Sequence, residues 1–296
     1  MTIQKSGMVS LVGRPNVGKS TLMNTLLGYK VSIVSDKPQT TRHRLCAVLN
    51  QGDTQVVLMD TPGFHRSQNK LGDYMVRVVR ESVTDVDAVV LMVEPVPRVG
   101  TPETMLIERL HQAKRPAILV INKVDTVKKD SLLAVIDAYQ KVFSFSAIVP
   151  MSAKEGDGTE LLFDELKPFL PEGPALYPEG QTTDQPERAL IAESVREKLL
   201  NHLDKEVPHG TAVVVEKLHE RENGLVEIGV VIVCEKASHK GILIGKNGAM
   251  LKTIGQEMRT ELEELYEGPV LFRSWVKIKE DWRDRPGLLH ELGFDL

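Results

Sequence analysis

Short apolar runs alternate with amphipathic stretches over the first 170 residues of the chain. Runs rich in Val, Ile and Leu predict strands, and apolar positions at helical spacing predict helices. Continuous apolar strands are typical of a parallel sheet buried on both faces, and strand–helix alternation predicts a doubly wound α/β domain. We expect strands at Met8–Val12, Leu45–Leu49, Val56–Met59, Asp87–Val93, Ala117–Ile121 and Phe145–Met151, and helices at Ser20–Leu27, Leu71–Ser82, Pro102–Gln112, Ser131–Lys141 and Glu160–Leu170.

This pattern stops at the segment 171–186, PEGPALYPEGQTTDQP, which contains four prolines and two glycines and shows no periodicity. Such a composition is typical of a linker between domains. We therefore expect a first domain at residues 1–170, a linker at 171–186 and a second domain at 187–296.

The second domain has a different order of elements. Its pattern predicts helix, strand, strand, short helix, long helix and strand, which is a smaller α+β domain. The expected elements are a helix at Arg188–Leu203, strands at Thr211–Leu218 and Leu225–Cys234, a helical turn before the loop 241–248, a helix to about Tyr266 and a strand at Val270–Ile278.

Composition narrows the class of protein. The net charge is −4, but the first 170 residues carry +3 and the remainder −7, so nucleic-acid binding by the second domain would need a local basic patch. Cys46 and Cys234 form no paired or zinc-binding pattern, which favours reduced thiols. No apolar run is long enough to span a bilayer, and the start lacks the apolar stretch of a signal peptide. We therefore expect a cytoplasmic protein.

The segment Gly13–Ser20, GRPNVGKS, matches the phosphate-binding pattern GxxxxGK[ST] between a predicted strand and a predicted helix. Backbone N–H groups of such a loop surround a phosphate at the helix N-terminus, while the lysine neutralises its charge. The alternative is a glycine-rich turn with a chance lysine. The predicted nucleotide-binding residues are Gly13, Arg14, Pro15, Asn16, Val17, Gly18, Lys19, Ser20 and Thr21.

The segment Asp60–Gly63, DTPG, follows the next apolar strand. The Asp60 carboxylate can hold Mg²⁺ through water, together with the Ser20 hydroxyl. Gly63 lets its N–H approach the terminal phosphate of a nucleotide. The alternative is a strand that ends in Asp and turns at Pro-Gly.

The segment Asn122–Asp125, NKVD, follows another apolar strand and is predicted to select the base. The alternative is a charged loop after a strand. The Asp125 carboxylate can accept two hydrogen bonds, from guanine N1–H and N2–H₂, which adenine lacks, so the pattern favours GTP over ATP. Asn122 can bond to N7 and brace the loop, and the stem of Lys123 can lie along the base. Ser152, Ala153 and Lys154 follow the last strand, where the Ala153 N–H can donate to guanine O6.

The order and spacing of these motifs resemble the translation-factor-type P-loop GTPases. This resemblance implies a first switch at Thr40–Arg42, with the Thr41 hydroxyl meeting Mg²⁺ in the GTP state, so Ser20, Thr41 and Asp60 are the expected magnesium ligands. The catalytic groups are then Lys19, Thr41 and Gly63.

Phe64 occupies the position where Ras-like enzymes place a water-orienting Gln, so intrinsic hydrolysis should be slow. His65 and Arg66 lie nearby but are expected to be exposed loop residues. GTPases with Asn at the position of Asn16 bind K⁺ beside the phosphates, which suggests a potassium route for this chain. The alternative is that Asn16 is a turn residue.

In the second domain, the loop Ile242–Gly248, ILIGKNG, lies between two helices and resembles the GxxG loop of a KH domain of the bacterial arrangement. Lys236–Arg259 contains five basic residues and one carboxylate, which predicts a basic face for single-stranded RNA. The apolar groove is expected to include Ile254. Phe272, Trp275 and Trp282 are expected to be core or packing residues, and the alternative is that they stack on bases. The predicted RNA-binding residues are Ile242, Ile244, Gly245, Lys246, Asn247, Gly248 and Lys252.

Nearly the whole chain resembles the Era-type bacterial GTPases, with GRPNVGKS, QTTR, DTPG, NKVD, SAK and ILIGKNG in order. The resemblance implies a monomeric factor, using GTP, GDP and Mg²⁺, that binds 16S rRNA near its 3′ end and acts in assembly of the small ribosomal subunit. It also implies peripheral contact with the inner membrane, which no sequence feature explains. Two alternative functions stay open: a signalling or cell-cycle GTPase whose nucleotide state is recognised by a protein partner, and an RNA-binding scaffold whose nucleotide site is structural and does not turn over.

Overall fold

The computed structural model describes residues 2–64 and 67–294. Contacts between residues divide the chain into two compact units. The first contains Met1–Ser67 and Met75–Asp184, and the second contains Gln68–Tyr74 and Gln185–Leu296.

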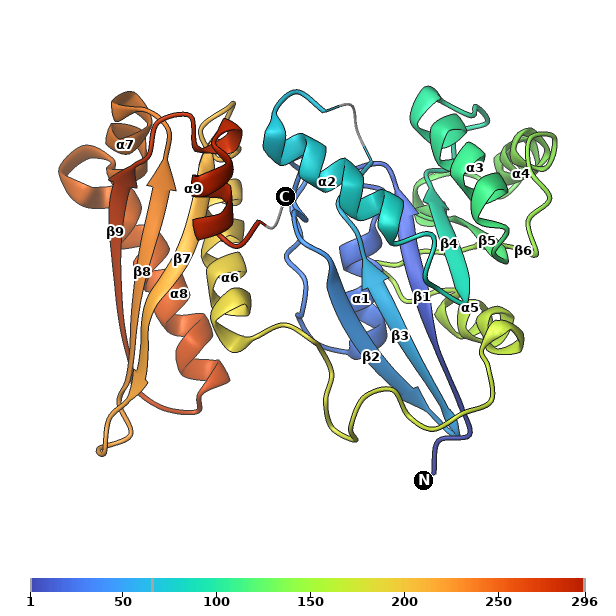
Figure 1. Cartoon of the computed structure of the whole chain (residues 1–296), viewed down its shortest axis with the longest axis horizontal. Helices are drawn as coiled ribbons and strands as arrows, with labels where there is room; N and C mark the ends of the chain where they lie inside the picture. The colour runs from blue at the N-terminus through green and yellow to red at the C-terminus, as the bar shows by residue number, and fades with distance from the viewer. Residues whose placement is uncertain (1, 65–66, 295–296) are drawn as a thin grey trace. The chain divides into compact units, whose positions relative to one another are not determined.

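The first unit is built on a six-stranded sheet with the order β2-β3-β1-β4-β5-β6 (Figure 1). All neighbouring strands are parallel except β2, which pairs antiparallel with β3 at one edge. The two strands β2 and β3 are joined by a tight turn, so an antiparallel pairing is the geometry the chain allows. The strands are β1 (Lys5–Gly13), β2 (Leu45–Gln51), β3 (Thr54–Asp60), β4 (Ala88–Val93), β5 (Ala117–Ile121) and β6 (Ala147–Pro150).

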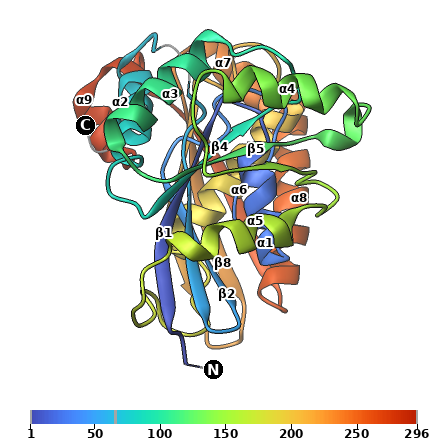
Figure 2. The same cartoon turned by 90° about the vertical axis from the view of Figure 1, so that its right-hand side faces the viewer.

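Helices cover both faces of this sheet (Figures 1 and 2). Apolar side chains of α2, α3 and α4, such as Val79, Leu106 and Val135, form one buried core with the strands. The helices α1 and α5 lie on the opposite face, where Leu22 and Phe163 are buried. The helices are α1 (Lys19–Leu27), α2 (Lys70–Glu81), α3 (Thr101–Ala113), α4 (Ser131–Gln140) and α5 (Thr159–Leu166), with the 3₁₀ turns η1 (Val124–Thr126) and η2 (Lys167–Phe169).

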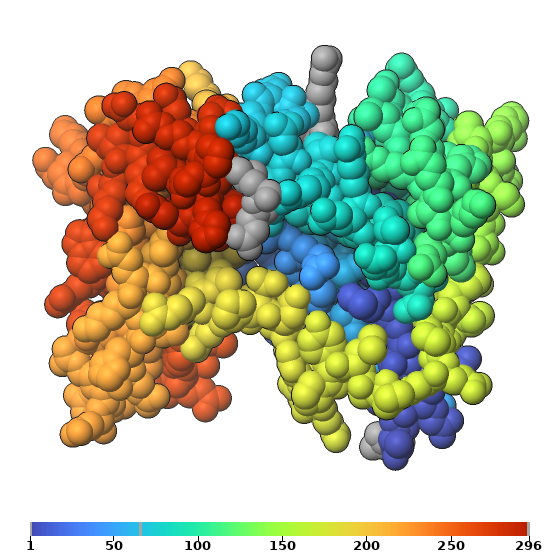
Figure 3. All heavy atoms as spheres, viewed as in Figure 1, coloured from blue at the N-terminus to red at the C-terminus, as the bar shows by residue number. Residues whose placement is uncertain are grey.

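The first part of the predicted linker, 171–184, lies along the surface of the first unit (Figure 3). The Ser6 hydroxyl donates to the Pro174 carbonyl at 2.6 Å, and Gln55 Oε1 accepts from the backbone N–H of Tyr177 at 2.9 Å. Near the end of the segment, the Asp184 carboxylate accepts from the Cys46 N–H at 2.9 Å. The segment is therefore bound to the sheet, which its composition did not indicate.

The second unit contains a three-stranded sheet in which β8 pairs antiparallel with β7 and parallel with β9. Helices α6 and α8 pack on the sheet around a core that includes Val195, Val230 and Met258. The expected order of elements is present, followed by the turn η4 and the helix α9, which the sequence analysis missed. The elements are α6 (Glu187–His202), β7 (Thr211–Glu220), β8 (Val226–Cys234), α7 (Ala237–Ile244), η3 (Lys246–Gly248), α8 (Ala249–Leu265), β9 (Val270–Ile278), η4 (Trp282–Asp284) and α9 (Pro286–Glu291).

The two cysteines, Cys46 and Cys234, are buried and unpaired. Over residues 2–64 and 67–294, none of the helices combines the length and the apolar character that crossing a membrane requires.

Candidate nucleotide-binding site and GxxG loop

The predicted phosphate-binding loop connects the end of β1 to the start of α1. The helix α1 has no side-chain N-cap; its N-cap residue is Gly18, with φ of 101°. A Cβ atom on Gly18 would lie 2.1 Å from the Asn122 amide nitrogen, so a larger residue cannot be placed there. Uncapped N–H groups at a helix start are the groups that bind a phosphate, and this geometry fits that role.

Lys19 is buried at the base of the loop, with 5% of its surface exposed. Its ammonium donates to the carbonyl of Arg14 at 3.1 Å and more weakly to that of Gly13 at 3.4 Å. Burial lowers the pKa of Lys19, and the charge of Asp60 opposes this shift. A buried cation held mainly by neutral carbonyls is poorly compensated, so an anionic ligand beside it would be stabilised.

The three predicted magnesium ligands lie together. Asp60 Oδ2 accepts hydrogen bonds from the Ser20 hydroxyl at 2.7 Å and the Thr41 hydroxyl at 3.2 Å, and the two hydroxyl oxygens are 3.1 Å apart. Ser32, which the sequence analysis did not select, also donates to Asp60 Oδ2, at 3.2 Å.

The other carboxylate oxygen, Asp60 Oδ1, is buried and has no hydrogen-bond partner among the described residues. Burial raises the pKa of the Asp60 carboxyl, against the opposing effects of the Lys19 charge and the hydroxyl donors. A hard divalent cation prefers such oxygen ligands and would relieve the cost of the unpaired oxygen. Ser20, Thr41 and Asp60 therefore fit Mg²⁺.

Gly63 and Phe64 contact the phosphate-binding loop directly. A Cβ on Gly63 would lie 2.6 Å from the Cα of Pro15, and the Phe64 N–H donates to the Gly13 carbonyl at 3.0 Å. The Phe64 ring is buried, and the guanidinium of Arg109 lies 4.6 Å from the ring centroid. Phe64 thus holds the end of the segment 60–64 in the core of the first unit. The neighbouring residues 65 and 66, expected to be exposed, lie outside the described residues.

Asn122 ties two loops together at the end of β5. Its amide nitrogen donates to the Val17 carbonyl at 2.7 Å, and its oxygen accepts from the Ala153 N–H at 2.8 Å. The side chain is 2% exposed, so its bracing role is present in this structure. A hydrogen bond from Ala153 to guanine O6 would have to share or replace the bond to Asn122.

The other residues predicted to bind the guanine base, Lys123, Asp125 and Ser152, lie close to Asn122 in sequence or on the loop that it contacts. The Lys123 ammonium donates to Glu94 at 2.6 Å, which holds its stem in place. Asp125 is exposed, whereas Ser152 is buried and accepts from the Glu155 N–H at 3.4 Å. The carboxylate of Asp125 is therefore accessible to a ligand.

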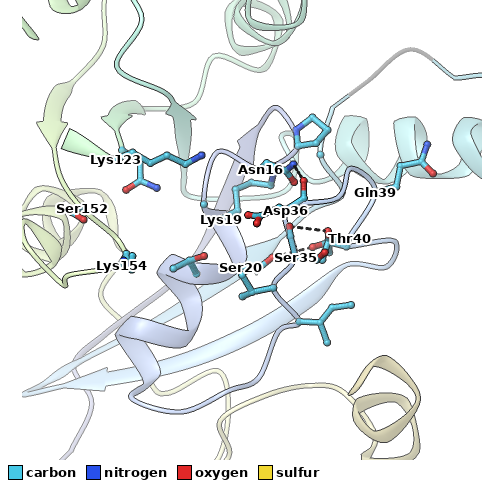
Figure 4. A pocket seen from close by; sticks show the side chains of 18 of the residues that line it. Asn16, Lys19, Ser20, Ser35, Asp36, Gln39, Thr40, Lys123, Ser152 and Lys154 are labelled. Atoms are coloured by element: carbon cyan, nitrogen blue, oxygen red, sulfur yellow. Dashed lines mark hydrogen bonds between the residues drawn. The ribbon is translucent and has the colours of Figure 1, made fainter. Parts of the chain in front are cut away.

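A cavity of about 500 Å³ connects these groups. Figure 4 shows side chains around it from four segments: the phosphate-binding loop with the start of α1, the loop before Thr41, Lys123 after β5, and Ser152 and Lys154 after β6. Gly13, Arg14, Val17, Asp60 and Ala153 do not line it. The loop 33–39 was not predicted as part of the site, because it has no periodicity and no motif. Its place directly before the predicted switch at Thr40–Arg42 was the available signal. The lining residues are Pro15, Asn16, Gly18, Lys19, Ser20, Thr21, Ile33, Val34, Ser35, Asp36, Gln39, Thr40, Thr41, Gly63, Asn122, Lys123, Asp125, Thr126, Ser152 and Lys154.

In the second unit, the GxxG loop joins α7 to α8. Gly245 has φ of 75°, and a Cβ there would lie 2.8 Å from the Met250 nitrogen, so the first glycine is required by a close approach. The tip residues Lys246 and Asn247 are exposed. Such a tip allows a nucleic-acid backbone to approach the protein backbone.

The apolar residues around this loop differ in accessibility. Ile242 is 49% exposed, and Ile244 packs partly against the core. The expectation that Ile254 helps to line a groove is wrong, because its side chain is fully buried in the core. Lys252, on the first turns of α8, is exposed.

The aromatic residues of the last stretch also differ. Trp282 is buried, and its indole N–H donates to the Gly210 carbonyl at 3.0 Å. Phe272 packs against the core, as expected. Trp275 is 49% exposed on β9, so it lies outside the core, but its ring packs over Gly229 of the neighbouring strand, where an added Cβ would lie 3.2 Å from it.

Family models match both units. Residues 8–123 match a family described as 50S ribosome-binding GTPase, and residues 206–283 match the KH domain. Together with the cavity and the GxxG loop, these matches define a P-loop GTPase joined to a KH domain.

Relatives of the same length identify the family. The chain is 48% identical to GTPase Era of Ruminiclostridium cellulolyticum over 290 residues, covering 98% of this chain and 97% of the relative, and 46% identical to GTPase Era of Alkaliphilus metalliredigens, covering 98% and 99%. The chain belongs to the GTPase Era family, and it is a GTPase.

Two solved structures share the fold over the full length. A crystal structure of Era in complex with MgGDPNP and nucleotides 1506–1542 of 16S ribosomal RNA has a TM-score of 0.95 and 36% identity, covering 99% of this chain and 100% of that chain. A variant of Aquifex aeolicus Era bound to GDP and AlF₄⁻ has the same TM-score and coverage, with 37% identity. The predicted fold, a doubly wound GTPase domain with a smaller KH domain, is confirmed.

Proposed function

We propose that this chain is a guanine-nucleotide switch that binds single-stranded 16S rRNA near its 3′ end and acts in assembly of the small ribosomal subunit. The observation that carries the proposal is the exposed GxxG loop of a KH domain in the same chain as the GTPase cavity. The full-length similarity to an Era structure that contains 16S rRNA supports it.

The family description that mentions the 50S subunit matches less than half of the chain and covers only the GTPase part. We therefore favour the small subunit, because the relative with 16S rRNA is similar over 99% of this chain, including the KH domain.

In the nucleotide site, Lys19 and the N–H groups of the phosphate-binding loop hold the phosphates, and Asp125 reads guanine. Ser20, Thr41 and Asp60 would hold Mg²⁺, which neutralises charge on the phosphates when bound. Gly63 can present its N–H to the terminal phosphate because it has no side chain between itself and Pro15. These groups position the nucleotide and stabilise negative charge. Phe64 is buried in the core, and its ring has no polar group that could orient the attacking water.

The alternative proposed from the sequence, a signalling or cell-cycle GTPase read by a protein partner, is not favoured by the comparisons. A cytoplasmic location, a monomeric state and peripheral membrane contact remain predictions.

The potassium route remains a proposal, supported by the position of Asn16. Its amide nitrogen donates to the Asp36 carbonyl, and both residues line the nucleotide cavity. We expect hydrolysis to be faster in KCl than in NaCl at equal ionic strength, roughly tenfold or more, because a cation there replaces part of what an arginine finger supplies.

The measurement is single-turnover GTP hydrolysis in the two salts. Asn16→Ala should lose the difference, while Asn50→Ala, on the exposed end of β2, should keep it. Equal rates in KCl and NaCl for the unaltered chain would refute the potassium route.

RNA binding should depend on the tip of the GxxG loop. Lys246→Ala is expected to weaken binding of a single-stranded 16S rRNA 3′-end fragment by about 1–1.5 kcal/mol, or roughly tenfold, because one phosphate contact is lost. The slope of log affinity against log salt should fall by about 1. Fluorescence anisotropy at several salt concentrations measures both quantities.

The matched control is Lys277→Ala, an exposed lysine of the same unit whose ammonium pairs with Glu216 at 2.8 Å. Its affinity and salt slope should stay unchanged. If Lys246→Ala binds like the unaltered chain, the GxxG loop is not the RNA-binding element.

The switch requires that RNA affinity differ between the nucleotide states. GTP orders Thr41 and the segment 60–64, and reciprocity then requires bound RNA to favour the same nucleotide state. Equal RNA affinity in the GTP-analogue and GDP states would leave two independent binding functions without a switch.

A further inference from the structure

A second cavity lies between α2 and α3 in the first unit and has a volume of about 520 Å³. It shares no lining residue with the nucleotide cavity. Its volume lies in the range of small-molecule sites, roughly 300–1,000 Å³. The lining residues are Arg80, Val83, Thr84, Met105, Glu108, Arg109, Gln112 and Ala113.

Two arginines face this cavity without a counter-ion. Within residues 2–64 and 67–294, no ion pair joins Arg80 or Arg109 to a carboxylate, although Glu108 lines the same cavity. Arg109 Nη1 is buried and has no hydrogen-bond partner among the described residues. Its guanidinium stacks on the Phe64 ring, which satisfies none of its N–H donors.

This arrangement is unfavourable without a ligand. A buried donor that lacks a partner costs about 1–3 kcal/mol, and more when it is charged. Burial lowers the pKa of the Arg109 guanidinium, and the charge of Arg80 lowers it further. Arg80 is exposed, so its charge acts on a neighbouring guanidinium that is itself partly buried, and an anion between the two cations would offset both unfavourable effects on Arg109.

We propose that the cavity between α2 and α3 binds the phosphate monoester group of a small soluble molecule, held by Arg80 and Arg109. The planar guanidinium fork matches the geometry of phosphate oxygens and can bond to two of them at once. A monoester dianion compensates both cations, whereas a carboxylate or a phosphodiester carries one charge. The Gln112 amide lines the same space and can add a neutral donor. The Thr84 hydroxyl also lines it but already donates to the Arg80 carbonyl, at 3.4 Å.

The cavity is linked to the nucleotide site by Phe64. Arg109 packs on the Phe64 ring, and Phe64 directly follows Gly63, which lines the nucleotide cavity. A phosphate bound by Arg109 would therefore hold a guanidinium that packs on Phe64, and Phe64 belongs to the segment 60–64 of the nucleotide site.

The test is a titration with inorganic phosphate at constant ionic strength, followed by the ¹H–¹⁵N signals of the arginine side chains. The full chain is first loaded with Mg²⁺ and a non-hydrolysable GTP analogue, which fills the phosphate positions of the main site. We expect saturable binding with a Kd of about 1 mM, the range of a small ion held by two charged contacts. Arg80→Gln and Arg109→Gln should each weaken it at least tenfold.

Arg77→Gln is the matched control, because Arg77 lies on the same helix, pairs with Glu81 at 3.8 Å and does not line the cavity. It should bind phosphate like the unaltered chain. Dimethyl phosphate, a diester monoanion that mimics nucleic-acid and lipid phosphates, should bind at least fivefold more weakly than inorganic phosphate.

The proposal is wrong if the unaltered chain shows no saturation by 30 mM phosphate, roughly 30 times the expected Kd, or if both arginine variants bind unchanged. Equal or tighter binding of dimethyl phosphate would overturn the monoester assignment. A second readout is thermal unfolding, because a ligand that binds the folded state raises the midpoint. Phosphate should raise it above an ionic-strength-matched NaCl control, and this rise should disappear in Arg109→Gln.

Discussion

Replacing Lys19 with alanine is expected to reduce GTP turnover by at least about 10³-fold, as the loss of a preorganised charge at a reacting phosphate does in other enzymes. The ammonium lies buried at the base of the phosphate-binding loop, with its hydrogen bonds directed to the carbonyls of Gly13 and Arg14. Alanine leaves the loop glycines in place but removes the cation. Phosphate release under single-turnover conditions measures the loss.

Folding should survive this change, because the variant removes a buried charge whose pairing is poor. A thermal midpoint equal to or above that of the unaltered chain would show this. Lys129→Ala, an exposed lysine that does not line the cavity, should keep full turnover. If Lys19→Ala hydrolyses GTP normally, the phosphates are not bound where we place them.

Replacing Asp125 with asparagine is expected to weaken GTP binding by about 10²–10⁴-fold, because two hydrogen bonds to a charged acceptor, worth about 1.5–3 kcal/mol each, are lost. The amide N–H₂ of asparagine would also face the guanine donors. Xanthine carries a carbonyl at the C2 position, so the variant should gain affinity for the xanthosine nucleotide. Calorimetry with the two nucleotides measures both effects.

Asp130→Asn provides the control, because Asp130 is an exposed carboxylate at the start of α4 that makes no capping hydrogen bond and does not line the cavity. It should bind GTP like the unaltered chain. If Asp125→Asn loses no affinity, or loses affinity for both nucleotides alike, Asp125 does not read the base.

Most of the fold could be predicted from periodicity. The strand at Ala117–Ile121 has the predicted ends, and the other elements of the first unit differ by a few residues, because buried apolar runs determine them. The antiparallel pairing of β2 with β3 was not predicted, because an apolar run does not indicate whether the neighbouring strand is parallel or antiparallel. The helix α9 was missed because it is short and begins at Pro286 after a polar stretch.

The positions of site residues could be predicted where a sequence motif determines the backbone conformation. Contacts between side chains that are distant in the sequence could not be predicted in this way. Two motifs, one with Lys19 and Ser20 and one with Asp60, predicted side chains that the structure brings together. The sequence predicted that Asn122 can brace its loop, but it did not indicate the partners of the two amide atoms, Val17 and Ala153, because these contacts join residues more than 30 positions apart. The two arginines of the second cavity belong to no motif, so only the fold places them together.

The most direct test of the account is calorimetric titration of the nucleotide-free chain with GTP and with ATP in the presence of Mg²⁺. GTP should bind at least about 10³-fold more tightly than ATP, because a site built to bond guanine donors rejects a base that lacks them. Comparable affinity for the two nucleotides, or binding of neither, would contradict the assignment of the cavity between Lys19 and Asp125 as a guanine-nucleotide site.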